Sequence, residues 1–326
     1  ASEKTLAKMR LLGVDGDHES MTIEDIEARI LHGYAVTLRY SSIRPDLPHL
    51  LKAVVDKGYE IFDHLMMTTD GSTPSFHEDG VMDKCIRAAL EAGVRPVDAY
   101  NMASYNVARY YNMTNLHGLL ATGRYANINI LADEHSPTPE AVISKGVWLK
   151  RDNTDLKAFP EVDLSLFGDL KIDFDLHEGD FQFSMPIGVE MVNDVITKPY
   201  SIKNFGHYQH TLSTDHDESY LMLVDRNGKW RINTMIKGFA THVKGFASSY
   251  SNTGDIILIG KSVQDMQYAF QELKKMNGGI VLVEDEQIVT SIPLTLAGSI
   301  YDGTVDEVIP LELALKSALK KRGYHH

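Results

Sequence analysis

The sequence has little that would suit an oxidised, membrane-bound or nucleic-acid-binding protein. It has 326 residues and one cysteine, Cys85, so no intrachain disulfide can form. No apolar stretch approaches the roughly 20 residues that cross a bilayer as a helix. The formal net charge is −13, and the one basic cluster is Lys320-Lys321-Arg322, so phosphate backbones and anionic lipid are repelled. We therefore expect a cytoplasmic protein without a signal peptide, and neither nucleic acid nor membrane as a partner.

The composition is that of an ordinary globular protein. Hydrophobic residues make up 43% of the chain and charged residues 24%. This composition is sufficient for the chain to fold around hydrophobic cores. The length is sufficient for two domains. No internal repeat or low-complexity tract interrupts the sequence.

The first third of the chain alternates helix and strand signals. Thr22 can cap a helix with Asp25 at the capping-box position, and Gly33 can end it. The pattern then predicts strands over 35–38 and 61–69, and helices over 46–57, 81–92, 96–102 and 105–111. Repeated βα units favour a parallel sheet.

Beyond about residue 118 the sequence becomes rich in strand signals. We predict strands over 128–131 and 141–149, and a half-exposed strand over 172–176, where apolar and acidic residues alternate. Hairpins are predicted over 221–236, around Asn227-Gly228, and over 280–291, with a buried strand over 255–260 and an amphipathic helix over 263–276 between them. This part therefore reads as an α+β domain.

Candidate site residues follow two short apolar runs. Asp17-His18-Glu19 follows the first, and the run 66–69 leads into Asp70 and Gly71. A (β/α) barrel keeps its chemistry at the C-terminal ends of its strands, and imidazole with carboxylate suits a divalent transition metal. The pattern therefore suggests a metal hydrolase, although two ligands are too few to complete a site.

Each of these residues also has a plainer interpretation. His18 could be a surface histidine in a charged turn, and Asp70 could simply form a turn before Gly71. Arg39, beside Ser41, could bind a polar or anionic substrate group or be a solvated salt-bridge partner. Both interpretations stay open at this point.

Other histidines and the cysteine are weaker candidates. His207 and His210 form an H-x-x-H pair near His216, a spacing that indicates zinc only weakly without cysteine or a fixed helix. His64 lies inside a strand pattern and is expected to be a hydrogen-bonded core or barrel-rim residue. Cys85 falls on an apolar helix face, where packing explains it better than catalysis.

Several motifs together resemble the last barrel motifs and the second domain of bacterial adenine deaminases, which are amidohydrolase-superfamily enzymes. The order and spacing of these motifs cover nearly the whole chain. They are Asp17-His18-Glu19-Ser20, Thr37-Leu38-Arg39-Tyr40-Ser41-Ser42, Thr68-Thr69-Asp70, Ala103-Ser104-Tyr105-Asn106, Gly123-Arg124-Tyr125-Ala126-Asn127, Gly254-Asp255-Ile256-Ile257, Gly278-Gly279 and Ile292-Pro293-Leu294.

The resemblance implies an α/β fold made from part of a larger protein. Residues 1–122 would be the C-terminal part of a metal-dependent (β/α) barrel, holding its last three βα units. Residues 123–162 would be return strands of a small β-sandwich domain, and residues 163–326 an adenine deaminase-type C-terminal α+β domain. The chain looks like a divergent branch, because Tyr40 and the segment 250–255 stand where the family usually has other motifs.

The resemblance also implies a reaction and its residues. It implies hydrolysis at C6 of adenine to hypoxanthine and ammonia with a divalent metal, manganese first and iron or zinc otherwise. His18 and Asp70 would be metal ligands, and Asp70 with Glu19 would be the catalytic groups. Arg39 and Ser41 would contact the substrate.

Partners follow from the same resemblance. We expect a purine-like small molecule as substrate, and the missing N-terminal barrel segment or a second chain to cover exposed strand edges. A homo-oligomer is expected. The rival interpretation is a non-catalytic, purine-like ligand-binding or regulatory protein that kept the fold.

Overall fold

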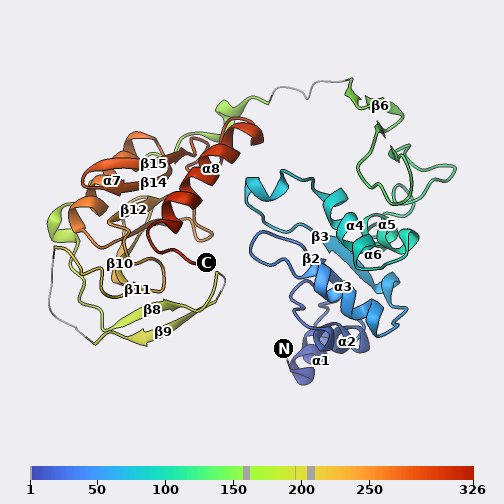
Figure 1. Ribbon diagram of the computed structural model, residues 1–326, viewed down its shortest axis with the longest axis horizontal. Coiled ribbons are helices and arrows are strands. Elements are labelled where there is room, and N and C mark those ends of the chain that lie inside the picture. The colour runs from blue at the N-terminus through green and yellow to red at the C-terminus, as the bar shows by residue number, and fades with distance from the viewer. Residues whose placement is uncertain (1, 157–161, 195, 204–209) are drawn as a thin grey trace. The chain divides into compact units, whose positions relative to one another are not determined.

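The chain forms two compact units in the computed structural model. The first unit spans residues 1–160 and the second spans 161–326, and Figure 1 shows the helices and strands of each. The structure describes residues 2–156, 162–194, 196–203 and 210–326.

The first unit contains a parallel sheet with the strand order β1-β2-β3. These strands are β1 (Gly16–Asp17), β2 (Ala35–Arg39) and β3 (Leu65–Thr68). Its α-helices are α1 (Glu3–Leu11), α2 (Ile23–Leu31), α3 (Leu47–Asp56), α4 (Met82–Glu91), α5 (Pro96–Ala103) and α6 (Tyr105–Tyr110). The short 3₁₀ helices η1 (Phe62–His64) and η2 (Pro74–His77) flank β3. The predicted run of βα units is confirmed.

The sequence explains which face of this sheet is buried. In β2, Val36 and Leu38 pack into a core with α3 and α4 residues, including Leu51 and Cys85. Side chains alternate along a strand, so Arg39 leaves β2 on the face opposite Leu38. One face of the sheet is therefore apolar against helices, and the other carries polar side chains.

Local capping signals are reproduced closely. Thr22 accepts a hydrogen bond from the backbone of Asp25 at 3.2 Å, and the Asp25 carboxylate accepts from the backbone of Thr22 at 3.3 Å. The predicted capping box is confirmed, and α2 ends before Gly33 as expected.

The predicted strand over 61–69 is wrong at its start. Residues Phe62–His64 form η1, and β3 begins at Leu65. Asn106 on α6 donates to the carbonyls of Phe62 and Leu65, both at 2.8 Å, which turns the chain before the strand. His64 is therefore exposed at the end of η1, so the expectation of a core histidine is wrong, whereas a barrel-rim position stays a prediction.

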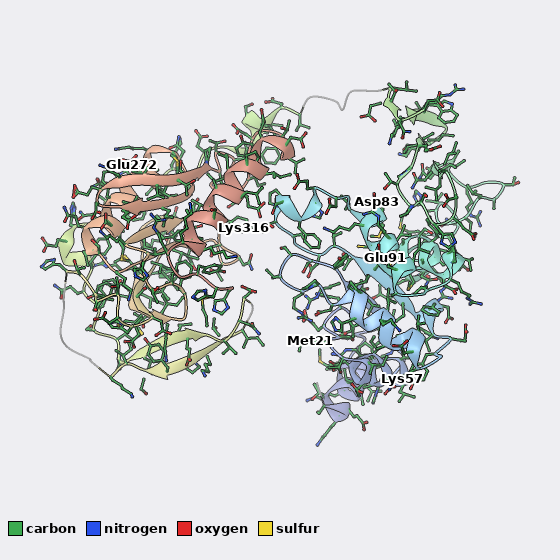
Figure 2. The ribbon with its side chains drawn as sticks, viewed as in Figure 1. Met21, Lys57, Asp83, Glu91, Glu272 and Lys316 are labelled. Carbon is green, nitrogen blue, oxygen red and sulfur yellow. The ribbon has the colours of Figure 1, made fainter. Side chains whose placement is uncertain are left out.

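A small antiparallel sheet follows in the first unit. Its strands are β4 (Ile128–Ile130), β5 (Ala141–Ser144), β6 (Val147–Arg151) and β7 (Thr154–Asp155), paired in chain order. Asp83 on α4, labelled in Figure 2, accepts a hydrogen bond from Thr138 at 2.8 Å and so connects this region to the helix layer. That residues 123–162 belong to a β-sandwich domain stays a prediction.

The second unit is built on a larger sheet. Among its described residues the strand order is β15-β14-β12-β13-β10-β11-β8-β9. The strands are β8 (Ile187–Met191), β9 (Thr197–Ser201), β10 (Glu218–Val224), β11 (Arg231–Lys237), β12 (Gly245–Ser248), β13 (Ile256–Gly260), β14 (Gly279–Glu284) and β15 (Gln287–Pro293). Neighbours are antiparallel except β8 and β11, which are parallel.

Helices α7 (Val263–Lys275) and α8 (Val305–Lys320) pack on opposite faces of this sheet. On β10, Met222 faces the core that contains Phe270 of α7, whereas Leu221 faces the core that contains Leu315 of α8. Side chains alternate between the two faces along a strand, so consecutive residues of β10 point to opposite faces, and each face is covered by a helix. The predicted α+β character of this part agrees with this arrangement.

Two features of the second unit differ from expectation. Residues 172–176 are described but form no strand. Ile172 and Leu176 are buried in the core with α7, and the side chains of Gln267 and Lys274 on α7 donate to the carbonyls of Leu176 and Phe174, both at 2.9 Å. Helix α8 was not identified from the sequence; it contains Pro310, a residue that is unfavourable inside a helix. Within the described residues, no helix is both long and apolar enough to cross a bilayer.

Candidate functional site

The site residues proposed from sequence gather at one edge of the parallel sheet. His18 and Glu19 follow the end of β1, Arg39 ends β2, and Asp70 lies two residues beyond β3. Parallel strands place their C-terminal ends at the same edge. The fold thus brings together residues that lie far apart in sequence.

Arg39 lies at the centre of this group. Its Nη2 donates to Oε2 of Glu19 at 2.8 Å, and its Nη1 donates to Oδ2 of Asp70 at 3.0 Å. The imidazole Nε2 of His18 is 3.5 Å from Oε1 of Glu19. An imidazole, two carboxylates and a guanidinium therefore meet at the strand ends.

The turn after β1 is fixed by Asp17. Its Oδ2 accepts hydrogen bonds from the backbone of Glu19 at 3.0 Å, from the Ser20 hydroxyl at 3.2 Å and from Nε of Arg29 at 2.5 Å. Arg29 is a buried charge on α2 and also pairs with Asp25 at 3.0 Å. Sequence reasoning missed Arg29, although a charged residue on the apolar face of a helix is the signal that marks it.

Asp70 has an unusual backbone and an ionised side chain. Its φ is 50°, and its backbone N–H donates to the Thr68 hydroxyl at 3.0 Å. Partial burial opposes ionisation, but the backbone N–H of Gly71, the Arg39 guanidinium and the nearby His18 together hold the pKa of Asp70 below its ordinary value. The carboxylate is therefore charged at neutral pH, as a metal ligand or proton acceptor needs to be.

Ser41 belongs to a tight turn after β2. It is 1% exposed, its backbone N–H donates to the Arg44 carbonyl at 3.2 Å, and its hydroxyl accepts from the Arg44 backbone at 3.0 Å. Arg44 in turn donates to Asp46 at 2.7 Å and reaches Glu19 at 3.5 Å. Arg44 was not identified from sequence, and its role follows from the tertiary contacts alone.

The donors at this edge fit a divalent metal in kind but not in number. Imidazole and carboxylate are the usual ligands of manganese, iron and zinc. Within the part of the chain that the structure describes, no group of three or more histidine, cysteine or acidic side chains is placed to hold a metal. His18 and Asp70 could therefore supply part of a coordination shell whose other ligands lie elsewhere.

Among the described residues, the other candidates form no second centre. His207 lies outside the described residues, and His210 is 67% exposed in its side chain and 3.6 Å from Glu178. The weak zinc hypothesis gains no support from the described residues. Cys85 is fully buried, and burial raises the pKa of its thiol to about 12, so the packing interpretation is confirmed.

Comparison with known proteins defines the class. Residues 3–149 match the amidohydrolase family, and residues 194–326 match the adenine deaminase C-terminal domain. The first match places the chain among the amidohydrolases. The second, together with relatives that match over the full chain, places it in the adenine deaminase family, to which the chain belongs.

Three relatives illustrate this membership. The chain is 48% identical to "Putative adenine deaminase YerA" of Bacillus subtilis over 99% of this chain and 56% of that protein. It is also 48% identical to a Halalkalibacterium halodurans relative, over 100% of this chain and 56% of the relative. The adenine deaminase of Dehalococcoides mccartyi is 28% identical over 91% of this chain and 53% of that protein. The chain thus spans about half the length of the curated relatives it matches.

Proposed function

We propose that this chain is part of a metal-dependent hydrolase that deaminates adenine, or a related amino-purine or cyclic amide, releasing ammonia. The observation that carries the proposal is the meeting of His18, Glu19 and Asp70 at the strand ends of a chain in this family. Amidohydrolases are generally metal-dependent. No observation favours the non-catalytic rival.

His18 and Asp70 would hold the metal, with manganese the first candidate and iron or zinc the others. A bound divalent cation supplies a Lewis acid that makes a water molecule easier to deprotonate. Asp70, which is ionised, would accept and return the proton at its carboxylate oxygen. Glu19 is the second proposed catalytic group, and its carboxylate is fixed by Arg39 at 2.8 Å.

Arg39 and Ser41 are the residues proposed from sequence to contact the substrate. Tyr40, between them, packs on the helix side of the sheet, with its ring 5.5 Å from that of Phe76 and the Lys84 ammonium 5.7 Å from its centroid. Tyr40 therefore faces away from Arg39. An altered substrate preference in this branch would have to come from other residues.

The remainder of the barrel is part of the proposal. The chain covers 56% of the Bacillus subtilis relative, and in the first unit β1 and β3 are the outer strands of their sheet. We propose that the other strands and metal ligands come from the segment that the relatives also contain, or from a second chain, and that the complete protein is a homo-oligomer. Residues 1–122, 123–162 and 163–326 would be its barrel, sandwich and C-terminal parts.

The test is an ammonia-release screen on the full-length protein loaded with manganese. Adenine is assayed first, followed by other amino-purines, pterins and hydantoin-like cyclic amides, with Asp70→Asn as the matched inactive control. Turnover of an amino-purine by wild type, and at least a 100-fold loss in Asp70→Asn, is the expected result. No turnover of any compound by fully metallated protein would favour the non-catalytic rival.

A further inference from the structure

Arg39 is a buried charge with an unusual pair of partners. The residue is 8% exposed, and its two terminal nitrogens each donate to a different carboxylate, Glu19 at 2.8 Å and Asp70 at 3.0 Å. The remaining nitrogen, Nε, is buried and has no hydrogen-bond partner among the described residues. Burying a guanidinium is costly unless it is paired with an opposite charge. The two carboxylates therefore offset the cost of burying the charge of Arg39.

The strand order explains why one side chain can reach both carboxylates. β2 is the middle strand of β1-β2-β3, and Arg39 is its last residue. Glu19 follows the neighbour on one side, and Asp70 follows the neighbour on the other. The planar guanidinium fork presents donors along separate edges, so it spans the two neighbours in a way that a lysine ammonium cannot.

We propose that Arg39 is a positioning residue that fixes the orientation of Glu19 and Asp70, and that it does not bind the substrate. This inference rests on the proposed function, in which Glu19 and Asp70 are the catalytic groups and Asp70 also binds the metal. Because Arg39 is 8% exposed and each of its terminal nitrogens already donates to a carboxylate, its side chain presents little to a ligand. The interpretation replaces the substrate contact expected from sequence.

A second arginine supports Glu19 from the loop after β2. Nη1 of Arg44 lies 3.5 Å from the same Oε2 atom that Arg39 binds. Arg44 is itself held by Asp46 at 2.7 Å and by the turn that it forms with Ser41. The Ser41 hydroxyl therefore has a local task in shaping this loop. Asp46, Arg44, Glu19, Arg39 and Asp70 form a continuous charged chain across the sheet edge.

The test compares Arg39→Lys, Arg39→Met and Arg39→Ala with an exposed control. Arg95 is the control, because it also pairs with two carboxylates, Asp98 at 2.6 Å and Glu60 at 3.3 Å, while its side chain is 64% exposed. For each full-length variant, kcat and KM for ammonia release and the affinity for Mn²⁺ by equilibrium dialysis are measured. Arg95→Met should match wild type in all three.

A positioning role predicts a specific split between the kinetic constants. Arg39→Met should lower kcat about 10- to 100-fold, as loss of groups that orient metal ligands does, with KM within about threefold of wild type. Arg39→Lys should keep the fold but recover little of kcat. Added guanidinium ion should partly restore kcat to Arg39→Ala, which a merely misfolded variant would not show. A large rise in KM with kcat retained would make Arg39 a substrate contact and overturn the inference.

Mn²⁺ affinity separates this inference from the proposed function. Arg39→Met should bind Mn²⁺ about 10-fold more weakly or worse, because Asp70 loses its orienting partner. If wild type turns over no compound, the proposed function fails, and weaker Mn²⁺ binding by Arg39→Met still upholds the positioning role. Equal or tighter binding would show that Arg39 merely competes with the cation, and would overturn the inference. Absence of Mn²⁺ binding by wild type would overturn both.

Discussion

Arg39 and Asp70 lie 31 positions apart in the chain, yet Nη1 of Arg39 donates to Oδ2 of Asp70 at 3.0 Å. The contact exists because β2 and β3 are parallel neighbours whose C-terminal ends meet, with Arg39 paired in register to Thr68. It helps to hold the pKa of Asp70 below its ordinary value against the opposing effect of burial. The Asp70 carboxylate, proposed for metal binding and proton transfer, is therefore ionised at neutral pH with a margin to which Arg39 contributes.

Removing either proposed ligand should remove the metal. His18→Ala and Asp70→Ala in the full-length protein should each lose most of their bound metal and turnover, because each removes a donor from a site already short of donors in this chain. His210→Ala is the matched control, since its side chain is exposed and remote in sequence from the sheet edge. Inductively coupled plasma mass spectrometry measures the metal, and undiminished metal in either ligand variant would refute its assignment.

Asp83 should make the first unit sensitive to acid. Burial opposes its ionisation, but hydrogen bonds from Thr138 and from the Val81 and Lys84 backbones outweigh burial and lower the pKa of Asp83. A lowered pKa in the folded state gives stability that is present above the ordinary carboxyl pKa of about 4 and is lost as pH falls through the lowered value. Asp83→Asn should therefore lose stability at neutral pH and show a smaller further loss on acidification.

The measurement is the thermal midpoint of each variant across the acid range. Exposed Asp56, which pairs with Lys52 on the surface, provides Asp56→Asn as a control that should follow wild type. An unchanged acid dependence in Asp83→Asn would contradict this role. The hydrogen bond to Thr138 also predicts faster amide exchange around residues 133–140 in Asp83→Asn.

Lys261 should be essential to the second unit. The residue is 1% exposed, and its ammonium donates to the carbonyls of Ser213, His216 and Glu218 at 2.7, 2.6 and 2.9 Å. Lys261→Met removes these bonds and leaves buried carbonyls without a donor, so unfolding free energy should fall by roughly 2–4 kcal/mol. Lys244, whose side chain is 37% exposed and pairs with Asp285, gives Lys244→Met as the control, expected within about 0.5 kcal/mol of wild type. Urea unfolding distinguishes the two.

Gly298 should tolerate no side chain. Its φ is +70°, and a Cβ there would lie 2.4 Å from Cδ2 of Leu170. Gly298→Ala should therefore cost both backbone strain and a displaced core residue, roughly 2–4 kcal/mol. Gly254 has a φ of +80°, but a Cβ there would meet its nearest atom only at 3.9 Å. Gly254→Ala therefore measures the cost of backbone strain alone. Equal losses of unfolding free energy in the two variants would show that the clash of the new Cβ at residue 298 with Leu170 costs nothing.

The sequence by itself determined the features that depend on neighbours along the chain. Thr22 and Asp25 form their capping box because both partners lie within one turn of α2. The βα alternation, the β10–β11 hairpin and α7 follow from periodicity and local turns. The motifs around His18, Arg39 and Asp70 also indicated the family.

Only the tertiary structure decided the features that depend on distant partners. Residues 172–176 alternate as a strand does, but in the structure they form no strand and pack against α7, whose side chains hydrogen-bond their carbonyls. Asn106 donates to the carbonyls of Phe62 and Leu65 where η1 leads into β3, and nothing near His64 in sequence reveals this contact. The guanidinium of Arg39 joins carboxylates that follow β1 and β3, because strand order brings them together. The periodicity of apolar residues in the sequence shows which face of a helix or strand is apolar. Only the packed fold determines which charged side chains meet at the edge of the sheet.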